Sequence, residues 1–293
     1  DNYVELVRLS ANIHPITIAE AIADLETDDI WRVLSHLPPS TRAEVFVEMD
    51  EQDQEEILDT LSARELSQLF NQMSPDDRAD LFNQLDEATQ NEVLRSLAHA
   101  ERDDIRRLSA YEEGTAGSIM TSDYICLSPE TSAADAISSL RTQAPKRKSL
   151  YYIFVVDHDR KLLGFVSLRD VILAPQYKKL GDMIHRDIIL SDVHEDQEEA
   201  VKKIAKYDLM SLPVINENGI LVGVITSDDA IDVMQQENTE DIEKLMGISG
   251  DHSDTSYLNT PILEHFRRRV PWIVALSFVG LVSGFVIQTF ENT

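Results

Sequence analysis

The sequence predicts a multidomain protein in which an all-α superhelical N-terminal domain precedes an α/β pair of similar units, a connecting helix and one transmembrane helix. Three observations predict this order: a helical repeat with a spacing of 36 residues, a strand-rich pattern that returns after 59 residues, and an uncharged apolar run near the C-terminal end. With 293 residues, of which 43% are hydrophobic, the chain can bury more than one core. The boundaries that we expect are residues 1–112, 113–179, 180–246, 247–269 and 270–290.

The chain is strongly acidic, with 53 Asp and Glu against 26 Lys and Arg and a formal net charge of -27. Such a body repels nucleic acid and anionic headgroups and concentrates cations around itself. We therefore expect no nucleic-acid partner. The single cysteine, Cys126, cannot form an internal disulfide, which fits a core position in a reducing cytosol.

The helical repeat lies in residues 37–61 and 73–97, which align without a gap and share 10 of 25 residues. Pro39 and Pro75 occupy the same place in it, and proline suits the first turn of a helix. Apolar residues follow at the spacing of one helix face, namely Val45, Phe46 and Met49, and Leu81, Phe82 and Leu85. Short helices that bury one stripe on their neighbours predict a superhelical domain over residues 1–112.

The middle of the chain alternates strand-like and helix-like segments in two similar halves. We expect strands at residues 124–127, 152–156 and 162–166 and again at 187–190, 212–215 and 220–225, with helices at 133–140 and 198–207. The sequences GFVSLRD (164–170) and GVITSDD (223–229) occupy matching places. This doubled pattern resembles the tandem CBS domains, which implies two units of strand, helix, strand, strand and helix.

The neighbouring segments narrow the resemblance. The helical repeat, the stretch YEEGTAGSIMT (111–121), the CBS pattern, the acidic TEDIEKL (239–245) and the start of a membrane region together resemble the MgtE family of bacterial magnesium channels. The resemblance implies a homodimer with a cytosolic helical domain, a CBS pair, a plug helix and five transmembrane helices per subunit. Only the first of these five is expected in this chain.

Acidic residues dominate the second half of the CBS pattern, where residues 190–245 contain 14 acidic and 4 basic side chains. In a helix after Asp229, the side chains of Ile231, Met234, Ile242 and Leu245 share one face, and the acids gather on the opposite face. Like charges at this spacing repel each other, and a hard divalent cation relieves the repulsion. Carboxylates without His or Cys favour Mg2+, and scattered, partly hydrated ones suit it better than Ca2+.

The MgtE resemblance implies particular regulatory Mg2+ contacts. It assigns them to Asp208, Asp229, Asp232, Glu237, Glu240, Glu198 and the backbone of Ala205. A second acidic set, Asp76, Asp77 and Asp80, is our candidate for the edge that the helical domain contributes. For this second set the alternative is a solvated helix start that the helix dipole favours.

The pairs Ser167–Asp170 and Thr226–Asp229 allow two interpretations. A Ser or Thr followed three residues later by an acid closes a helix N-terminus without any ligand. In CBS domains the same pair commonly faces a nucleotide ribose, and the MgtE resemblance implies ATP contacts at Tyr152, Arg169 and Asp170. Leu209 stands where an aromatic side chain could stack on adenine, so nucleotide binding stays open. His185 and His194 are interpreted as surface or turn residues.

The run at residues 270–290 contains no charged residue and is long enough to cross a bilayer. Arg267, Arg268 and Arg269 precede it, which favours the cytoplasmic side for residues 1–269 of a cell-membrane protein. We expect an amphipathic plug helix at residues 247–269. Because the chain begins with Asp1 and has a lone span, we interpret it as a fragment of a longer membrane protein.

The leading hypothesis is a cytosolic Mg2+ sensor that gates an MgtE-type channel. The alternative is an adenine-nucleotide-sensing CBS module that regulates another membrane transporter, and a structural scaffold ranks third. No phosphate-binding loop, HExxH motif or nucleophile elbow occurs in the sequence, so we do not expect an enzyme.

Overall fold

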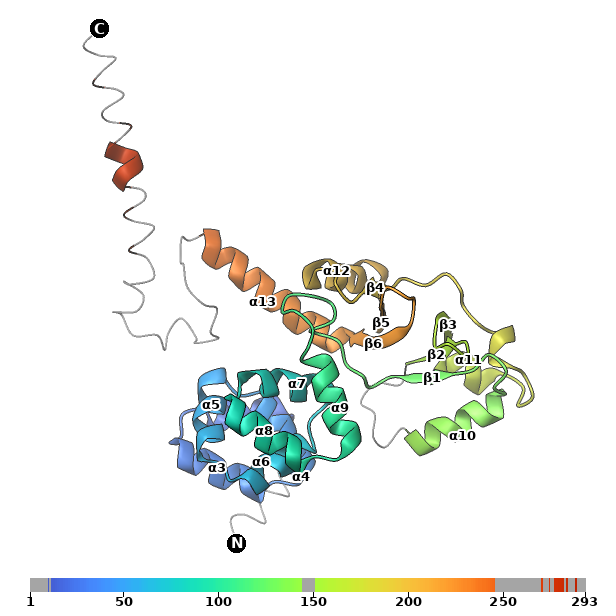
Figure 1. Ribbon diagram of the computed structural model, residues 1–293, viewed down its shortest axis with the longest axis horizontal. Coiled ribbons are helices and arrows are strands. Elements are labelled where there is room, and N and C mark those ends of the chain that lie inside the picture. Colours follow the sequence, from blue (N-terminus) through green and yellow to red (C-terminus); the bar gives the residue numbers. More distant parts are fainter. Residues whose placement is uncertain are drawn as a thin grey trace.

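The computed structural model describes residue 10, residues 12–143 and 151–245, and residues 270, 274, 277–281, 283 and 288. Within this part of the chain, a helical domain is followed by two three-stranded sheets with flanking helices (Figure 1). The prediction of an all-α domain followed by an α/β pair is confirmed.

Short helices joined by tight connections build the N-terminal domain. They are α2 (Pro15–Ile22), α3 (Thr27–His36), α4 (Pro39–Val47), α5 (Glu51–Thr60), α6 (Ala63–Phe70), α7 (Pro75–Gln84), α8 (Glu87–Ser96) and α9 (His99–Leu108). Pro39 and Pro75 open α4 and α7, as the repeat predicts. Helices α2, α4, α6 and α8 pack each on the next in this series, and α7 packs on α9. One core that includes Leu34, Phe46 and Phe70 runs through the domain.

Each half of the α/β region has its own sheet. The first half contains β1 (Ile125–Leu127), α10 (Ala133–Gln143), β2 (Tyr152–Val156), β3 (Leu162–Ser167) and α11 (Leu168–Leu173). The second contains the 3-10 turn η2 (Leu180–Asp182), β4 (Ser191–Asp192), α12 (Gln197–Tyr207), β5 (Ser211–Ile215), β6 (Leu221–Thr226) and α13 (Ser227–Leu245). In both sheets the middle strand pairs parallel with the first strand and antiparallel with the third.

The strand expected at residues 187–190 is wrong, because the strand of this region is β4, which begins directly after it at Ser191. Its parallel ladder reaches only Val214 and Ile215 of β5. The segment before β4 meets the other unit instead. The His185 N–H donates to Phe165 O (2.9 Å), and the Phe165 N–H donates to His185 O (3.1 Å). An apolar run predicts a strand, but the position of its partner strand decides which residues pair.

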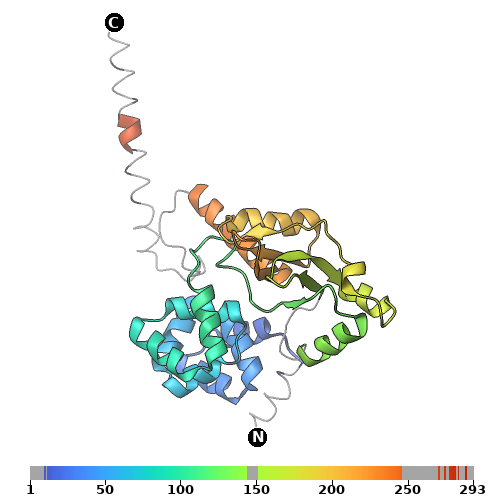
Figure 2. The same ribbon diagram turned by 45° about the vertical axis from the view of Figure 1, so that its right-hand side comes forward.

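The two units lie side by side (Figure 2). They contact each other through a shared apolar cluster. Tyr124 packs there with Phe154 and Val224, and its hydroxyl donates to Leu221 O (3.1 Å). Close by, Thr121 exchanges backbone hydrogen bonds with Val224 (2.8 and 3.0 Å). The segment of Thr121 can approach β6 this closely because residue 223 is a glycine. A Cβ atom there would lie 2.3 Å from Met120 Sδ.

No helix in the described part of the chain is both long and apolar enough to cross a membrane. The plug helix expected at residues 247–269 lies outside the described residues, as does most of the span expected at residues 270–290.

Candidate functional site

The first acidic set lies in the opening turns of α7. Ser74 caps the helix, because its Oγ accepts the Asp77 N–H (3.3 Å) and its hydroxyl donates to the Asp77 carboxylate. Pro75 fills the first turn, and the positive end of the helix dipole favours Asp76 and Asp77 there. The local sequence therefore explains why carboxylates gather at this helix start.

The second acidic set lies at the start of α13. The Thr226 hydroxyl donates to the Asp229 carboxylate, so the local contact is again a helix-start motif. Ala230 and Val233 belong to the core of the second CBS unit, and Ala79 of α7 packs in the same cluster. The shared apolar cluster joins α7 to the second CBS unit, and the two acidic sets line one cavity.

A cavity of ≈ 300 Å³ lies at this junction. Five aspartates line it, three from α7 and two from α13: Asp76, Asp77, Asp80, Asp229 and Asp232. Glu51 adds a further carboxylate, and no lysine, arginine, histidine or cysteine is among the lining residues in the described part of the chain. Carboxylates are therefore the charged donors of the cavity, beside the thioethers of Met49 and Met73. Its volume corresponds to about ten water molecules.

Burial raises the pKa of one carboxyl from each helix, Asp76 of α7 and Asp229 of α13. The pKa of Asp76 rises to about 6 because of burial and, next, the charge of Asp77. That of Asp229 rises to about 7 because of burial and, next, the charge of Asp76 across the domain boundary. Asp76 Oδ1 is buried and has no hydrogen-bond partner in the described residues. Two carboxyls that oppose each other's ionisation in this way fit a divalent cation.

Two of the three remaining cavity aspartates, Asp80 and Asp232, are more exposed to solvent. Burial is also the first cause that raises the pKa of Asp80, to about 7, and the pKa of Asp232 rises for the same reason. Both residues nevertheless keep more than a third of their surface exposed, so solvent screens their charges better than it screens Asp76. We give Asp76 and Asp229 the central places.

Four other predicted metal contacts, Asp208, Ala205, Glu198 and Glu237, do not line this cavity. Asp208 caps the C-terminal end of α12 in a left-handed conformation (φ 51°), and Ala205 is exposed on that helix. Glu198 forms an ion pair with Lys202 (2.8 Å). Glu237 Oε1 accepts a hydrogen bond from Gln197 Nε2 (2.6 Å). Glu240 lies on α13, and its side chain is outside the described residues. These assignments stay predictions.

Sequence reasoning missed two residues beside Asp76. Thr121 donates a hydrogen bond to it, which lowers its pKa and partly offsets burial. The buried Arg78 donates to Phe70 O and Met73 O (both 2.8 Å), and its charge acts on Asp76. The repeat contained a signal for Arg78, because Arg42 lies 36 residues earlier. No sequence signal connects Thr121 with Asp76.

The proposed nucleotide contacts lie at one end of β2 and β3. Ser167 Oγ donates to Asp170 Oδ2 (2.7 Å), and Tyr152 pairs with Ser167 in the sheet register. Arg169 is exposed on α11, and Leu209 packs partly buried on the second CBS core. His185, expected to be a surface residue, is exposed, but its Nε2 lies 3.1 Å from Asp170 Oδ2.

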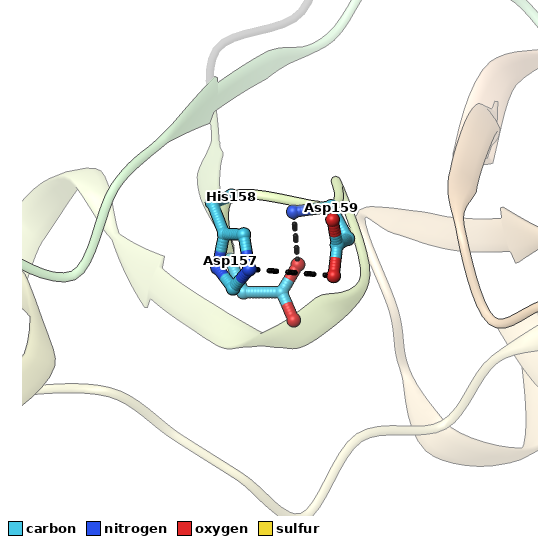
Figure 3. A group of neighbouring side chains, drawn as sticks. All are labelled: Asp157, His158 and Asp159. Carbon is cyan, nitrogen blue, oxygen red and sulfur yellow. Dashed lines mark hydrogen bonds and ion pairs between the residues drawn. The ribbon is translucent and has the colours of Figure 1, made fainter.

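One further acidic group lies in the turn between β2 and β3 (Figure 3). Asp157 Oδ1 accepts the backbone N–H groups of Asp159 and Lys161 (both 2.9 Å), and His158 Nε2 lies 3.4 Å from Asp159 Oδ2. Arg160 takes a left-handed conformation in the same turn (φ 63°). These contacts close the hairpin, and we assign the group a structural role.

Comparison with known families matches both parts of the chain. Residues 13–114 match the MgtE intracellular N domain, and residues 116–177 and 180–236 match the CBS domain. The fold and the site thus define a class of protein in which a helical N domain and a CBS pair together line a carboxylate-rich cavity. Together with the relatives below, these matches show that the chain belongs to the MgtE family.

The magnesium transporter MgtE of Thermus thermophilus is 36% identical over 191 residues, which are 65% of this chain and 42% of that protein. The magnesium transporter MgtE of Bacillus subtilis is 34% identical over 193 residues, 66% of this chain and 42% of that protein. The chain thus matches about two fifths of the length of these relatives, both of which are described as magnesium transporters.

Two solved structures resemble the fold closely. A crystal structure of the cytosolic domain of the Mg2+ channel MgtE in complex with ATP has 32% identity and a TM-score of 0.73, with 77% of this chain and 92% of that chain covered. A crystal structure of the soluble part of a magnesium transporter has 28% identity and a TM-score of 0.74, with 80% and 93% covered.

Proposed function

We propose that this chain is the cytosolic Mg2+-sensing and gating part of an MgtE-type magnesium channel. The observation that carries the proposal is the cavity between α7 and α13, in which the charges of Asp76 and Asp229 act on each other across the domain boundary. The relatives named above, which are described as Mg2+ channels and transporters, support the same ion.

The residues present fit Mg2+. The donors are carboxylates without His or Cys, and Asp76 Oδ1 is a buried oxygen that lacks a partner in the described residues. Mg2+ keeps several of its waters, and the cavity has room for a hydrated ion. Asp76 and Asp229 would hold the ion, with Asp77, Asp80 and Asp232 around it. The ion would supply positive charge that offsets the mutual repulsion of these carboxylates.

The mechanism is a population shift. When Mg2+ is scarce, the ionised carboxylates of α7 and α13 repel each other, and the N-terminal domain separates more readily from the CBS pair. The closed arrangement brings the carboxylates together and therefore binds Mg2+ better than the open one does, so abundant Mg2+ favours it. In the full-length protein, the closed arrangement would hold the plug helix in the position that shuts the pore.

The test is a titration of the chain with Mg2+, followed by small-angle scattering and by protease protection. We expect compaction at millimolar Mg2+, the order of magnitude for weak carboxylate sites. K+ at equal ionic strength is the control for charge screening. If Mg2+ changes neither the radius nor the protection, the sensor proposal is wrong.

A homodimer and a membrane location complete the proposal. Ile231 and Ile242 of α13 are 55% and 53% exposed, and an apolar row of this kind suits a contact with a second subunit. We place residues 1–269 on the cytoplasmic side of the cell membrane, because the matching part of a relative is described as its cytosolic domain.

We also propose that the first CBS unit binds ATP. Two observations favour it: the solved relative is a complex with ATP, and Tyr152, Ser167 and Asp170 lie together at the end of β2 and β3. Calorimetry with ATP tests this proposal independently of Mg2+ sensing. The absence of heat at millimolar ATP would overturn the nucleotide proposal and leave the cavity proposal unaffected.

A further inference from the structure

Two side chains donate to the same oxygen of Asp170. Ser167 Oγ lies 2.7 Å from Oδ2, and His185 Nε2 lies 3.1 Å from it. The His185 ring stacks on Phe165, with ring centroids 5.1 Å apart and planes 24° apart. Two backbone hydrogen bonds join the same two residues (2.9 and 3.1 Å). The imidazole is therefore held in place by groups that do not include Asp170.

The proton positions follow from the charge of the carboxylate. The hydrogen bonds from Ser167 and, next, from His185 hold the pKa of Asp170 below its usual value, so Asp170 is ionised at neutral pH. An ionised carboxylate only accepts hydrogen bonds, and His185 Nε2 must therefore carry the hydrogen. Both side-chain donors in the described part of the chain reach Oδ2. Neither of these side chains reaches Oδ1, which can accept a hydrogen bond from a ligand.

The second CBS unit has an equivalent backbone pair, but its side chain contacts a different carboxylate. Phe165 and Val224 are equivalent in the 59-residue pattern, and each pairs with a residue of the other segment, His185 and Thr121 respectively. Thr121 donates to Asp76 of the N-terminal domain, whereas His185 donates within its own site. The residue that pairs with Phe165 or Val224 thus contacts a carboxylate in both cases, Asp170 in the nucleotide site and Asp76 in the acidic cavity.

We propose that His185 is a positioning residue for nucleotide binding, which holds Oδ2 of Asp170 so that Oδ1 receives a ribose hydroxyl. The inference rests on the nucleotide part of the proposed function. His185 acts on the ribose contact alone, and AMP and ATP share the same ribose. Its removal therefore weakens the binding of both nucleotides by the same factor.

The test is calorimetry of the whole chain and its variants with ATP, AMP, 2′-deoxy-ATP and 3′-deoxy-ATP. We expect His185→Ala to weaken ATP and AMP binding about tenfold, as for one hydrogen bond to a charged group. His185→Gln, which restores an N–H donor, recovers most of this loss. The effect of His185→Ala falls below about twofold for the deoxy analogue that lacks the contacted hydroxyl, because interacting groups are not additive. His194→Ala, an exposed histidine, is the matched control and leaves binding unchanged.

Three outcomes overturn the inference. If His185→Ala binds ATP as tightly as the wild type or more tightly, His185 has no role in nucleotide binding, although the nucleotide site itself is supported. If His185→Ala weakens the binding of ATP and of both deoxy analogues by the same factor, His185 supports the fold of the site and not the ribose contact. A wild-type chain that binds neither ATP nor AMP overturns the nucleotide site together with this inference. Unchanged compaction by Mg2+ in His185→Ala shows that the variant is folded.

Discussion

Asp170 and Asp229 occupy the same motif, a carboxylate three residues after a hydroxyl at a helix start, yet their pKa values shift in opposite directions. Hydrogen bonds from Ser167 and His185 lower the pKa of Asp170. Burial and the charge of Asp76 raise that of Asp229, although Thr226 hydrogen-bonds to it. The difference arises because α7 of the N-terminal domain lines the same cavity as α13, so that the charges of Asp76 and Asp77 act on Asp229.

This contrast gives a prediction for the cavity residues. Asp76→Asn and Asp229→Asn each remove one negative charge without changing the size of the side chain. We expect the Mg2+ concentration at half-maximal compaction to rise at least about tenfold in either variant, because a charged ligand is lost. Metal-free chains of both variants should be more compact than the wild type at pH 7.5, since less repulsion remains.

The matched control is Asp24→Asn, which removes an exposed carboxylate of the N-terminal domain. It should leave the Mg2+ midpoint within about twofold of wild type, as expected for a solvated surface charge. Scattering measurements at constant ionic strength check both results. A midpoint in Asp229→Asn that equals the one in Asp24→Asn would contradict the assignment of Asp229.

At the scale of elements, the N-terminal repeat conserves one arginine contact between its two copies. Arg42 Nε donates to Leu34 O (3.0 Å), and Arg78 Nε donates to Phe70 O (2.8 Å), 36 residues further on. Each guanidinium thus joins the start of one helix to the end of the helix before it. Arg78 is 7% exposed, whereas Arg42 is only partly buried.

We expect Arg78→Ala to lower the free energy of unfolding of the N-terminal domain by about 3 kcal/mol, because two buried carbonyls lose their donor. Arg42→Ala should cost about half as much, since water can reach its site. Hydrogen exchange of the α6 and α7 amides measures this locally, which avoids treating a multidomain chain as two-state. Equal protection in Arg78→Ala and wild type would contradict the role of the contact.

The exposed apolar face of α13 gives a second prediction at this scale. Ile231 and Ile242 lie on it, while Ala230 and Val233 on the other side are buried. If the face meets a second subunit, Ile231→Lys should raise the dimer dissociation constant at least about tenfold. Sedimentation velocity over a range of concentrations checks this, with Glu217→Lys, an exposed acid in the β5–β6 turn, as the control for added charge. A wild-type chain that is monomeric at all concentrations would contradict the assignment of this face.

The whole molecule responds to protons and Mg2+ at the same place. Because the pKa values of Asp76 and Asp229 rise to about 6 and about 7 at the interface, the closed form binds more protons than the separated domains do above about pH 4. The metal-free closed form therefore loses this stabilisation as the pH rises through 6 to 7.

Without Mg2+, we expect the chain to be more compact at pH 5.5 than at pH 7.5, and saturating Mg2+ should largely remove the difference. An interdomain fluorescence-transfer pair, with one dye on the N-terminal domain and one on the CBS pair, measures the change. The Asp76→Asn, Asp229→Asn double variant should show a flattened pH response, which separates these two groups from the general decrease in net charge. A double variant with the wild-type response would contradict the prediction.

The local sequence already determined much of this protein. The repeated prolines predicted the starts of α4 and α7, and the doubled GFVSLRD and GVITSDD segments predicted the ends of β3 and β6 and the helices that follow. These features depend on backbone preferences and hydrogen bonds within a few residues, so a short stretch of sequence determines them.

Tertiary structure alone decided which of the many acidic residues meet. Asp76 and Asp229 are 153 positions apart in the sequence, and an apolar cluster that contains Ala79, Ala230 and Val233 places them at one cavity. The same holds for Thr121 with Asp76 and for His185 with Asp170. In a chain with 53 acidic residues, composition reveals an affinity for cations, but burial selects the site, and burial exists only once the domains have packed.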